Sequence, residues 1–126
     1  MVGLVVASHG RLADELVATA RQIVGDLPRI ATLSVEPQSS PEEIRNRMRE
    51  AVKSVDDGEG VLVFADLIGG SPCTQGLSLC QQARIEVVTG VNLPMLLKAS
   101  SLRAEVSLRD LAHQLDDAAL AHPLVA

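Results

Sequence analysis

His9 is the first residue of this sequence whose type and setting could support catalysis. It follows a short apolar run, Val2 to Ala7, within the segment Ser8-His9-Gly10-Arg11. A neutral imidazole offers one nucleophilic nitrogen when a hydrogen bond to the other nitrogen fixes the tautomer. A histidine at a strand end is otherwise an ordinary surface residue. Its chemistry therefore depends on which groups the fold brings beside it.

A second polar segment, Asp66 to Pro72, follows another apolar run, Val61 to Ala65. Its first residue is a carboxylate, which could accept a hydrogen bond from one ring nitrogen of His9. That contact would leave the other nitrogen nucleophilic. The two segments predict a nucleophilic histidine assisted by an aspartate, provided that the two strand ends lie side by side.

The elements that must position this pair alternate between strand and helix. Four segments are predicted as strands, 2–7, 30–35, 61–65 and 85–88, and the apolar runs 2–7 and 61–65 are typical of strands buried on both faces. Apolar residues at helical spacing predict helices between them and after the last strand. Their expected starts include Ser40 as an N-cap before Pro41, Ser71 as an N-cap before Pro72, Pro94, and Ser107. The helix after Ser71 is expected to run to about residue 83.

This alternation predicts an α/β fold with a doubly wound, mainly parallel sheet in the order 2-1-3-4 and helices on both faces. The whole chain, 1–126, is expected to form a single domain. In this order strands 1 and 3 are neighbours, so His9 and Asp66 emerge together where such sheets bind ligands. The mostly apolar tail, 121–126, could form an additional C-terminal edge strand.

Several residues around the pair suit a phosphoryl group. Gly10, Gly69 and Gly70 would let the backbone approach the site closely. Two helix N-termini, after Gly10 and at Ser71, would direct amide donors and positive dipole ends toward it. Arg11, expected in a first helical turn, would bind phosphate or an acidic partner there, or would remain an ordinary solvated arginine.

Composition excludes other classes of function. The chain has 126 residues, one Phe, no Tyr and no Trp, and a formal net charge of -5. Base-stacking nucleic-acid folds need aromatic platforms, and nucleic-acid binding favours a basic surface, so we expect no nucleic-acid partner. The first apolar run is too short for a signal peptide, and no run is long enough to span a bilayer. We therefore expect a cytoplasmic protein.

The remaining chemically capable residues have simpler interpretations. Cys73 and Cys80 would lie about 10 Å apart on one helix, beyond disulfide reach, and favour small buried residues. They form a poor zinc site, and no metal or other cofactor is predicted. His113 and His122 have no companion groups and favour the surface. A serine hydrolase using Ser71 is disfavoured because Pro72 has no N–H to donate to an oxyanion.

Three separated motifs give the chain a family resemblance. They are the strand ending in Ser8-His9-Gly10, the segment 66–72, and the segment 89–96, Thr-Gly-Val-Asn-Leu-Pro-Met-Leu. Together they resemble the enzyme IIA component of the mannose family of the bacterial phosphotransferase system. Departures from the family pattern occur at Arg11, Cys73 and Thr74, at the rim of the expected site.

The resemblance implies that His9 is phosphorylated and that Asp66 and Ser71 line the site. It also implies HPr as the phosphoryl donor, a separate IIB protein as the acceptor, and a homodimer that meets membranes only through transporter partners. The expected function is a protein-histidine phosphotransferase in sugar uptake. The alternative is a regulatory module whose phosphorylation state is sensed by another protein.

Overall fold

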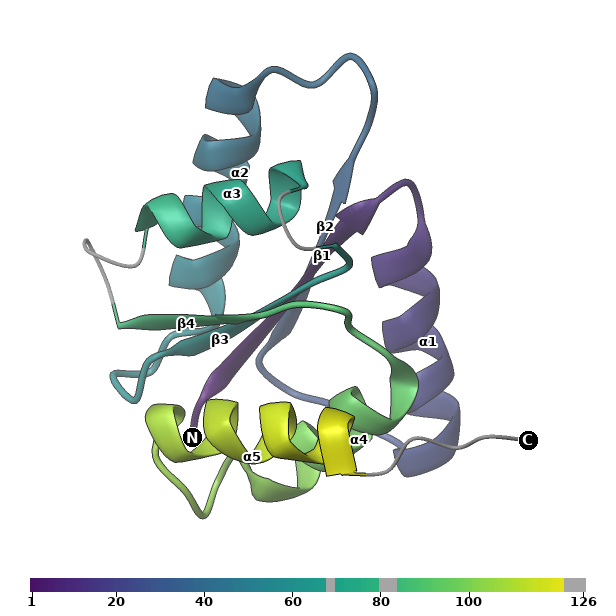
Figure 1. Cartoon of the computed structure of the whole chain (residues 1–126), viewed down its shortest axis with the longest axis vertical. Helices are drawn as coiled ribbons and strands as arrows, with labels where there is room; N and C mark the ends of the chain where they lie inside the picture. The colour runs from purple at the N-terminus through teal and green to yellow at the C-terminus, as the bar shows by residue number, and fades with distance from the viewer. Residues whose placement is uncertain (68–69, 80–83, 122–126) are drawn as a thin grey trace.

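The computed structural model describes residues 1–67, 70–79 and 84–121, with the backbone alone for 116–121. Strands and helices alternate through the first eight elements, and a ninth, helical element follows (Figure 1). They are β1 (Gly3–His9), α1 (Leu12–Val24), β2 (Ile30–Val35), α2 (Pro41–Val55), β3 (Val61–Ala65), α3 (Ser71–Leu79), β4 (Ile85–Val88), α4 (Leu93–Leu102) and α5 (Leu108–Ala121).

The four strands form one parallel sheet in the order β2-β1-β3-β4, as predicted. In the register of β1 with β3, Ala7 lies opposite Ala65, so the residues that follow these two positions leave the sheet together. The carboxyl ends of β1 and β3 are therefore neighbours, as the sequence indicated.

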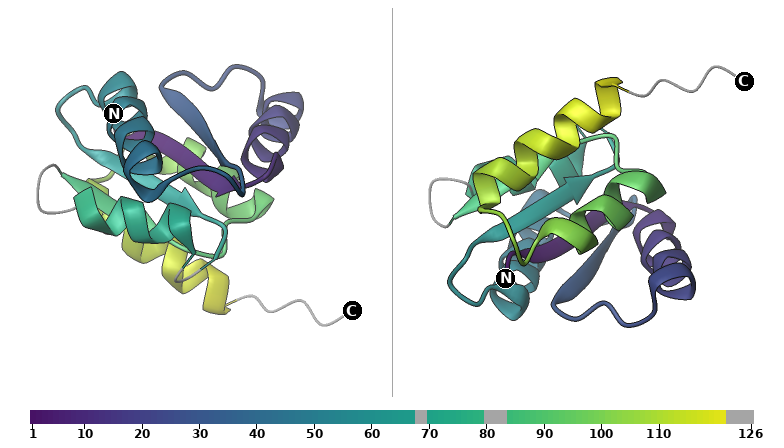
Figure 2. Two further views of the ribbon diagram at one scale, coloured as in Figure 1. Left: turned by 90° about the horizontal axis from the view of Figure 1, so that it is seen from above. Right: turned by 90° about the horizontal axis from the view of Figure 1, so that it is seen from below.

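Helices cover both faces of the sheet (Figures 1 and 2). Two separate apolar clusters result, because successive strand residues point to opposite faces. Leu4 and Val6 of β1 pack in the cluster formed with α1, α4 and α5, whereas Val5 and Ala7 pack in the cluster formed with α2 and α3. This alternation sets which helices the residues at the end of β1 will face.

The first strand is longer than the apolar run that predicts it. It continues through two polar residues, because Ser8 pairs with Ser34 and His9 pairs with Val35 of β2. His9 is thus the last residue of the strand, not the second residue of a loop. The backbone ladder fixes its position more firmly than a loop would.

Two of the four predicted helix starts, Ser40 and Ser107, are confirmed. The Ser40 hydroxyl accepts a hydrogen bond from the Glu43 N–H, and the Ser107 hydroxyl accepts one from the Asp110 N–H. The helix that contains Pro94 starts one residue earlier, after an N-cap at Asn92. Helix α5 reaches Ala121, so the predicted edge strand would lie in 122–126, outside the described residues. None of the helices in the described ranges combines the length and apolar character needed to cross a membrane.

Candidate functional site

Strand alternation places the side chain of His9 on the α2 and α3 side of the sheet. Ser8, the residue before it, points to the opposite side and is fully buried. There its hydroxyl accepts a hydrogen bond from the Ala13 N–H at 2.7 Å, which satisfies an amide in the first turn of α1. The two residues therefore have different roles: Ser8 connects the end of β1 to the start of α1, and His9 points to the side of the sheet that α2 and α3 cover.

His9 and Asp66 form the predicted pair. The Asp66 Oδ2 atom lies 2.9 Å from Nδ1 of the imidazole and also accepts the backbone N–H of His9 at 2.9 Å. The other carboxylate oxygen, Oδ1, accepts the Leu67 N–H at 2.9 Å. The side chain of Asp66 is 10% exposed and that of His9 is 49% exposed. The carboxylate is thus fixed and largely enclosed, while the ring stays accessible.

Burial and hydrogen bonding shift the pKa of Asp66 in opposite directions. Burial disfavours the charged carboxylate and would raise its pKa. The hydrogen bonds from the backbone and ring of His9, and the one from the Leu67 N–H, stabilise the charged form and hold the pKa of Asp66 below its ordinary value. Asp66 is therefore ionised near neutral pH and acts as a hydrogen-bond acceptor for the ring.

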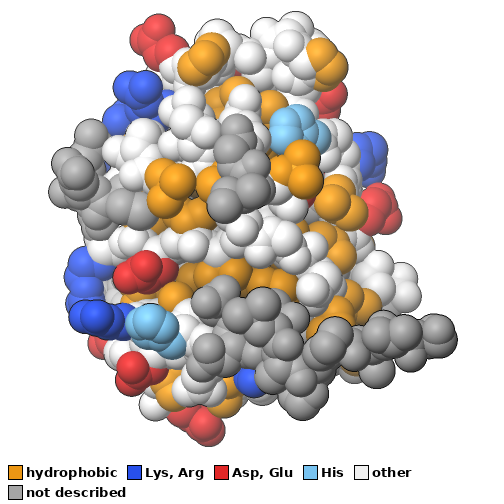
Figure 3. All heavy atoms as spheres, viewed as in Figure 1, with side chains coloured by type: hydrophobic (Ala, Val, Ile, Leu, Met, Phe, Trp, Pro, Cys, Tyr) orange, Lys and Arg blue, Asp and Glu red, His pale blue; other side chains and the backbone are white. Residues whose placement is uncertain are grey.

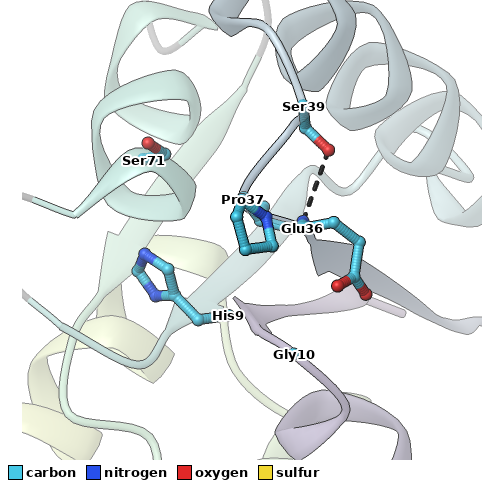
Figure 4. A pocket seen from close by; sticks show the side chains of 7 residues that line it. His9, Gly10, Glu36, Pro37, Ser39 and Ser71 are labelled. Carbon is cyan, nitrogen blue, oxygen red and sulfur yellow. Dashed lines mark hydrogen bonds between the residues drawn. The ribbon is translucent and has the colours of Figure 1, made fainter.

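An open pocket of about 560 Å³ lies beside His9. In Figure 4 the imidazole points toward Ser71, and the ring of Pro37 lies between the imidazole and the side chain of Glu36. Because Nδ1 is bound to Asp66, the nitrogen left for chemistry is Nε2. The pocket is lined by His9, Gly10, Val35, Glu36, Pro37, Ser39 and Ser71.

The start of α3 brings Ser71 and Gly70 to this pocket. Ser71 is the first helical residue and not the N-cap, because the Gly70 carbonyl accepts the first helical hydrogen bond, from the Thr74 N–H, at 2.9 Å. The predicted N-cap is therefore wrong by one position. A Cβ on Gly70 would lie 3.0 Å from Cε1 of His9, so the absence of a side chain lets this backbone lie against the ring.

Arg11 is placed differently from the prediction. It occupies the N-cap position of α1, before the first helical turn, and its guanidinium lies 3.6 Å from the Glu15 carboxylate. It does not line the pocket, whereas Gly10 does. Gly10 has a positive φ of 56°, the left-handed conformation that glycine adopts readily, and this turn takes the chain from β1 toward α1.

The other candidates do not join this group. Cys73 is a free, buried thiol, and His113 is exposed on α5. Gly69, Cys80 and His122 lie outside the described residues. In the part of the chain that the structure describes, no group of three or more His, Cys, Asp or Glu residues is arranged to hold a metal ion.

One wall of the pocket was not predicted from the sequence: it is formed by Glu36, Pro37 and Ser39 in the connection after β2. The Ser39 hydroxyl accepts the Glu36 N–H at 3.3 Å and closes this connection into a turn. The predicted strand order was sufficient to place this segment beside the site. Because β2 adjoins β1, the segment after β2 must emerge beside His9.

Comparison with known proteins assigns the chain to a family. Residues 3–115 match the EIIA-man family, described as PTS system fructose IIA component. The PTS system fructose-specific EIIA component of Bacillus subtilis is 26% identical over 116 residues, covering 91% of this chain and 80% of that protein. The mannose-specific EIIAB component of Escherichia coli is 27% identical over 81% of this chain, but the match spans only 32% of that longer protein.

Two further matches are relevant to function. The transcriptional regulatory protein LevR of B. subtilis is 33% identical over 73% of this chain and 9% of its own length. The mannose/sorbose specific IIA subunit of the phosphotransferase system from Enterococcus faecalis superposes with a TM-score of 0.87 at 28% identity, covering 99% of this chain and 95% of that one. The chain therefore belongs to the EIIA-man family of phosphotransferase-system IIA components.

Proposed function

We propose that this protein carries a phosphoryl group on Nε2 of His9, which it accepts from HPr and passes to a IIB protein during sugar uptake. The observation that carries the proposal is the orientation of the imidazole. Its Nδ1 is held by Asp66 at 2.9 Å, and its other edge faces an open pocket beside the N-terminus of α3. The activity is that of a protein-histidine phosphotransferase.

The transfer step follows from this arrangement. The lone pair of Nε2 attacks the phosphorus of the donor's phosphohistidine, and an N–P bond forms as the donor's N–P bond breaks. The electron pair of the broken bond stays on the donor imidazole. His9 then carries phosphorus on Nε2 and a proton on Nδ1, so its ring becomes cationic. The ionised Asp66 stabilises that cation without moving a proton.

The pocket supplies the groups that would bind the phosphoryl oxygens. Ser71 offers its hydroxyl and its N–H at the start of α3, where the helix dipole favours an anion. Gly70 brings its backbone close to the ring, and Gly69 is assigned the same role from the sequence. Gly10 lines the pocket at the turn after His9. Arg11 would have to leave Glu15 to reach this pocket, so we place it at the rim.

Phosphorylation can be tested directly. Incubation with phosphoenolpyruvate, enzyme I and HPr should add one acid-labile phosphate to the wild type and none to His9→Ala. The matched control is His113→Ala, which removes an exposed histidine from α5 and should leave labelling unchanged. Labelling that survives His9→Ala would refute the assignment.

We also propose a cytoplasmic homodimer with no nucleic-acid partner and contact with the membrane only through transporter partners. In support of the dimer, β4 is an edge strand. Hydrophobic side chains reach the surface between α3 and α5, where this strand runs (Figure 3). Sedimentation at increasing protein concentration would measure the oligomeric state.

A regulatory role is the second candidate, and the match to LevR favours it. In that case the phosphorylation state of His9 would be sensed by another protein. Affinity capture with phosphorylated and unphosphorylated protein distinguishes the two roles. A IIB protein that removes the phosphoryl group supports transport, whereas a partner that binds one state without accepting phosphate supports regulation.

A further inference from the structure

A buried amide joins α3, whose first residue lines the pocket, to α2. Gln75 of α3 is 6% exposed, and its Oε1 atom accepts a hydrogen bond from Nε of Arg45 in α2 at 3.2 Å. A buried amide is costly unless it is hydrogen-bonded, so this contact favours one position of α3 relative to α2.

Helix α3 has few bulky side chains with which to fix its position. In the apolar cluster on this face, α2 contributes Ile44, Met48, Val52 and Val55, whereas the described residues of α3 contribute Leu79. At Gly76, α3 lies so close to the sheet that a Cβ would be 3.2 Å from Cγ2 of Val87. A helix that packs through small residues depends more on polar contacts for its exact placement.

The same helix forms one side of the site around His9. Ser71 and Gln75 are four residues apart, so they lie on one face of α3. Ser71 lines the pocket, and Gly70, just before the helix, lies against the imidazole. A shift of α3 would therefore move both Ser71 and Gly70 relative to Nε2.

We propose that Arg45 and Gln75 are positioning residues for phosphoryl transfer, which hold the start of α3 at the correct distance from His9. This inference rests on the proposed function. The pair acts through Ser71 and Gly70 and does not touch the phosphoryl group. Its loss should slow transfer within the complex with HPr and leave the affinity for HPr nearly unchanged.

The test compares Gln75→Met, Arg45→Met and the double variant with the wild type. Gln75→Met keeps the length of the side chain and removes the acceptor, and Arg45→Met removes the donor. Arg49→Met is the matched control, because Arg49 lies one turn farther along α2 and hydrogen-bonds Asn46 of its own helix. Arg45 is exposed, so its variants should fold, and thermal unfolding verifies this for each protein.

Transfer from phosphorylated HPr, measured over a range of HPr concentrations, gives kcat and KM separately. Each single variant should lower kcat by about fivefold, the ratio expected for one ordinary hydrogen bond, with KM within about twofold of wild type. The double variant should be no slower than the slower single variant, because the two side chains act as one unit. Arg45→Lys should restore most of kcat, and Arg49→Met should change little.

Single variants within about twofold of wild type would overturn the inference, as would effects that multiply in the double variant or a control that is equally slow. A wild type that gains no phosphate on His9 would instead refute the proposed function, and this inference with it. A labelled wild type with unchanged variants refutes the positioning role alone.

Discussion

One oxygen of Asp66 accepts two hydrogen bonds from His9, from the backbone N–H and from Nδ1 of the ring, each at 2.9 Å. The carboxylate thus fixes the end of β1 and the direction of the imidazole at the same time. The side chain of Asp66 therefore links the position of the last residue of β1 to the tautomer of the His9 imidazole. Changes at Asp66 should therefore affect chemistry more than stability, since the ladder with β2 also holds His9.

Asp66→Asn should slow phosphorylation of His9 by about tenfold or more. The amide oxygen can still accept the hydrogen bonds from His9, but the side chain lacks the charge that stabilises the cationic ring, and a charge-assisted bond is worth about 1.5–3 kcal/mol. The measurement is the rate of transfer from phosphorylated HPr. The control is Asp14→Asn, because Asp14 binds Thr32 and Ser34 away from the pocket. Equal rates in Asp66→Asn and wild type would contradict the assigned role.

Acid should remove the stabilising contribution of Asp66. Its pKa in the folded protein lies below the ordinary value, which is about 3.9 in an unfolded chain. The contribution is therefore present above about pH 4 and is lost as pH falls through the folded pKa. Urea unfolding at several pH values should show that the free energy of unfolding falls less steeply toward low pH in Asp66→Asn than in wild type. Parallel curves for the two proteins would show that Asp66 is not the group responsible.

The sheet order and the pair at its switch point could be predicted because both follow from patterns along the sequence. Short segments rich in apolar residues identify the strands, and the strand order then places Asp66 beside His9. The end of β1 was less predictable. Ser8 and His9 are polar and continue the strand only because β2 supplies partners, which is a contact between segments far apart in the chain.

The sequence was also insufficient to predict the positions and contacts of side chains whose surroundings depend on tertiary packing. The guanidinium of Arg11 is a group that commonly binds phosphate, but in the structure it lies near the carboxylate of Glu15. The sequence places Ser8 in the loop after the strand, yet Ser8 is buried and its hydroxyl accepts the Ala13 N–H of α1. The placement of Arg11 and of Ser8 depends on the direction in which each side chain points between the end of β1 and the start of α1. This short connection has no periodic pattern of apolar residues from which that direction could be predicted.

Gly70→Ala should slow phosphoryl transfer with little loss of stability. The new Cβ would lie 3.0 Å from Cε1 of His9, so the ring must move away from the start of α3. Gly25→Ala is the contrasting variant, because Gly25 has a φ of 82° with nothing within 4 Å of the added Cβ. It should lose about 1 kcal/mol of stability through backbone strain and keep normal transfer. Transfer rates and urea unfolding measured on both proteins distinguish these effects. Normal transfer in Gly70→Ala would indicate that the ring tolerates displacement.

Arg103→Met should destabilise the fold without changing the chemistry at His9. Arg103 is 3% exposed, and its guanidinium donates hydrogen bonds to the carbonyls of Pro28 and Arg29. Arg103→Met removes both hydrogen bonds, at a cost of about 2 kcal/mol, although the Arg29 carbonyl keeps the hydrogen bond from the Leu4 N–H. Urea unfolding should report this loss, and Arg109→Met, at an exposed position on α5, serves as the control. A slower transfer rate in folded Arg103→Met would contradict the assignment of a purely structural role.

Leu67→Ser should weaken binding of HPr without slowing the transfer step. Leu67 is 59% exposed, and its Cβ would lie 3.6 Å from a Cβ on Gly70, the residue that lies against the His9 ring. We therefore expect a donor that reaches Nε2 to cover part of the Leu67 side chain. Burying half of a leucine side chain contributes about 1 kcal/mol, which corresponds to about a fivefold increase in KM. Ile23→Ser is the matched control, because Ile23 is 58% exposed at the far end of α1. We expect kcat to stay within about twofold of wild type in both variants. An equal rise in KM for the two would show that general surface hydrophobicity, and not docking beside His9, accounts for the effect.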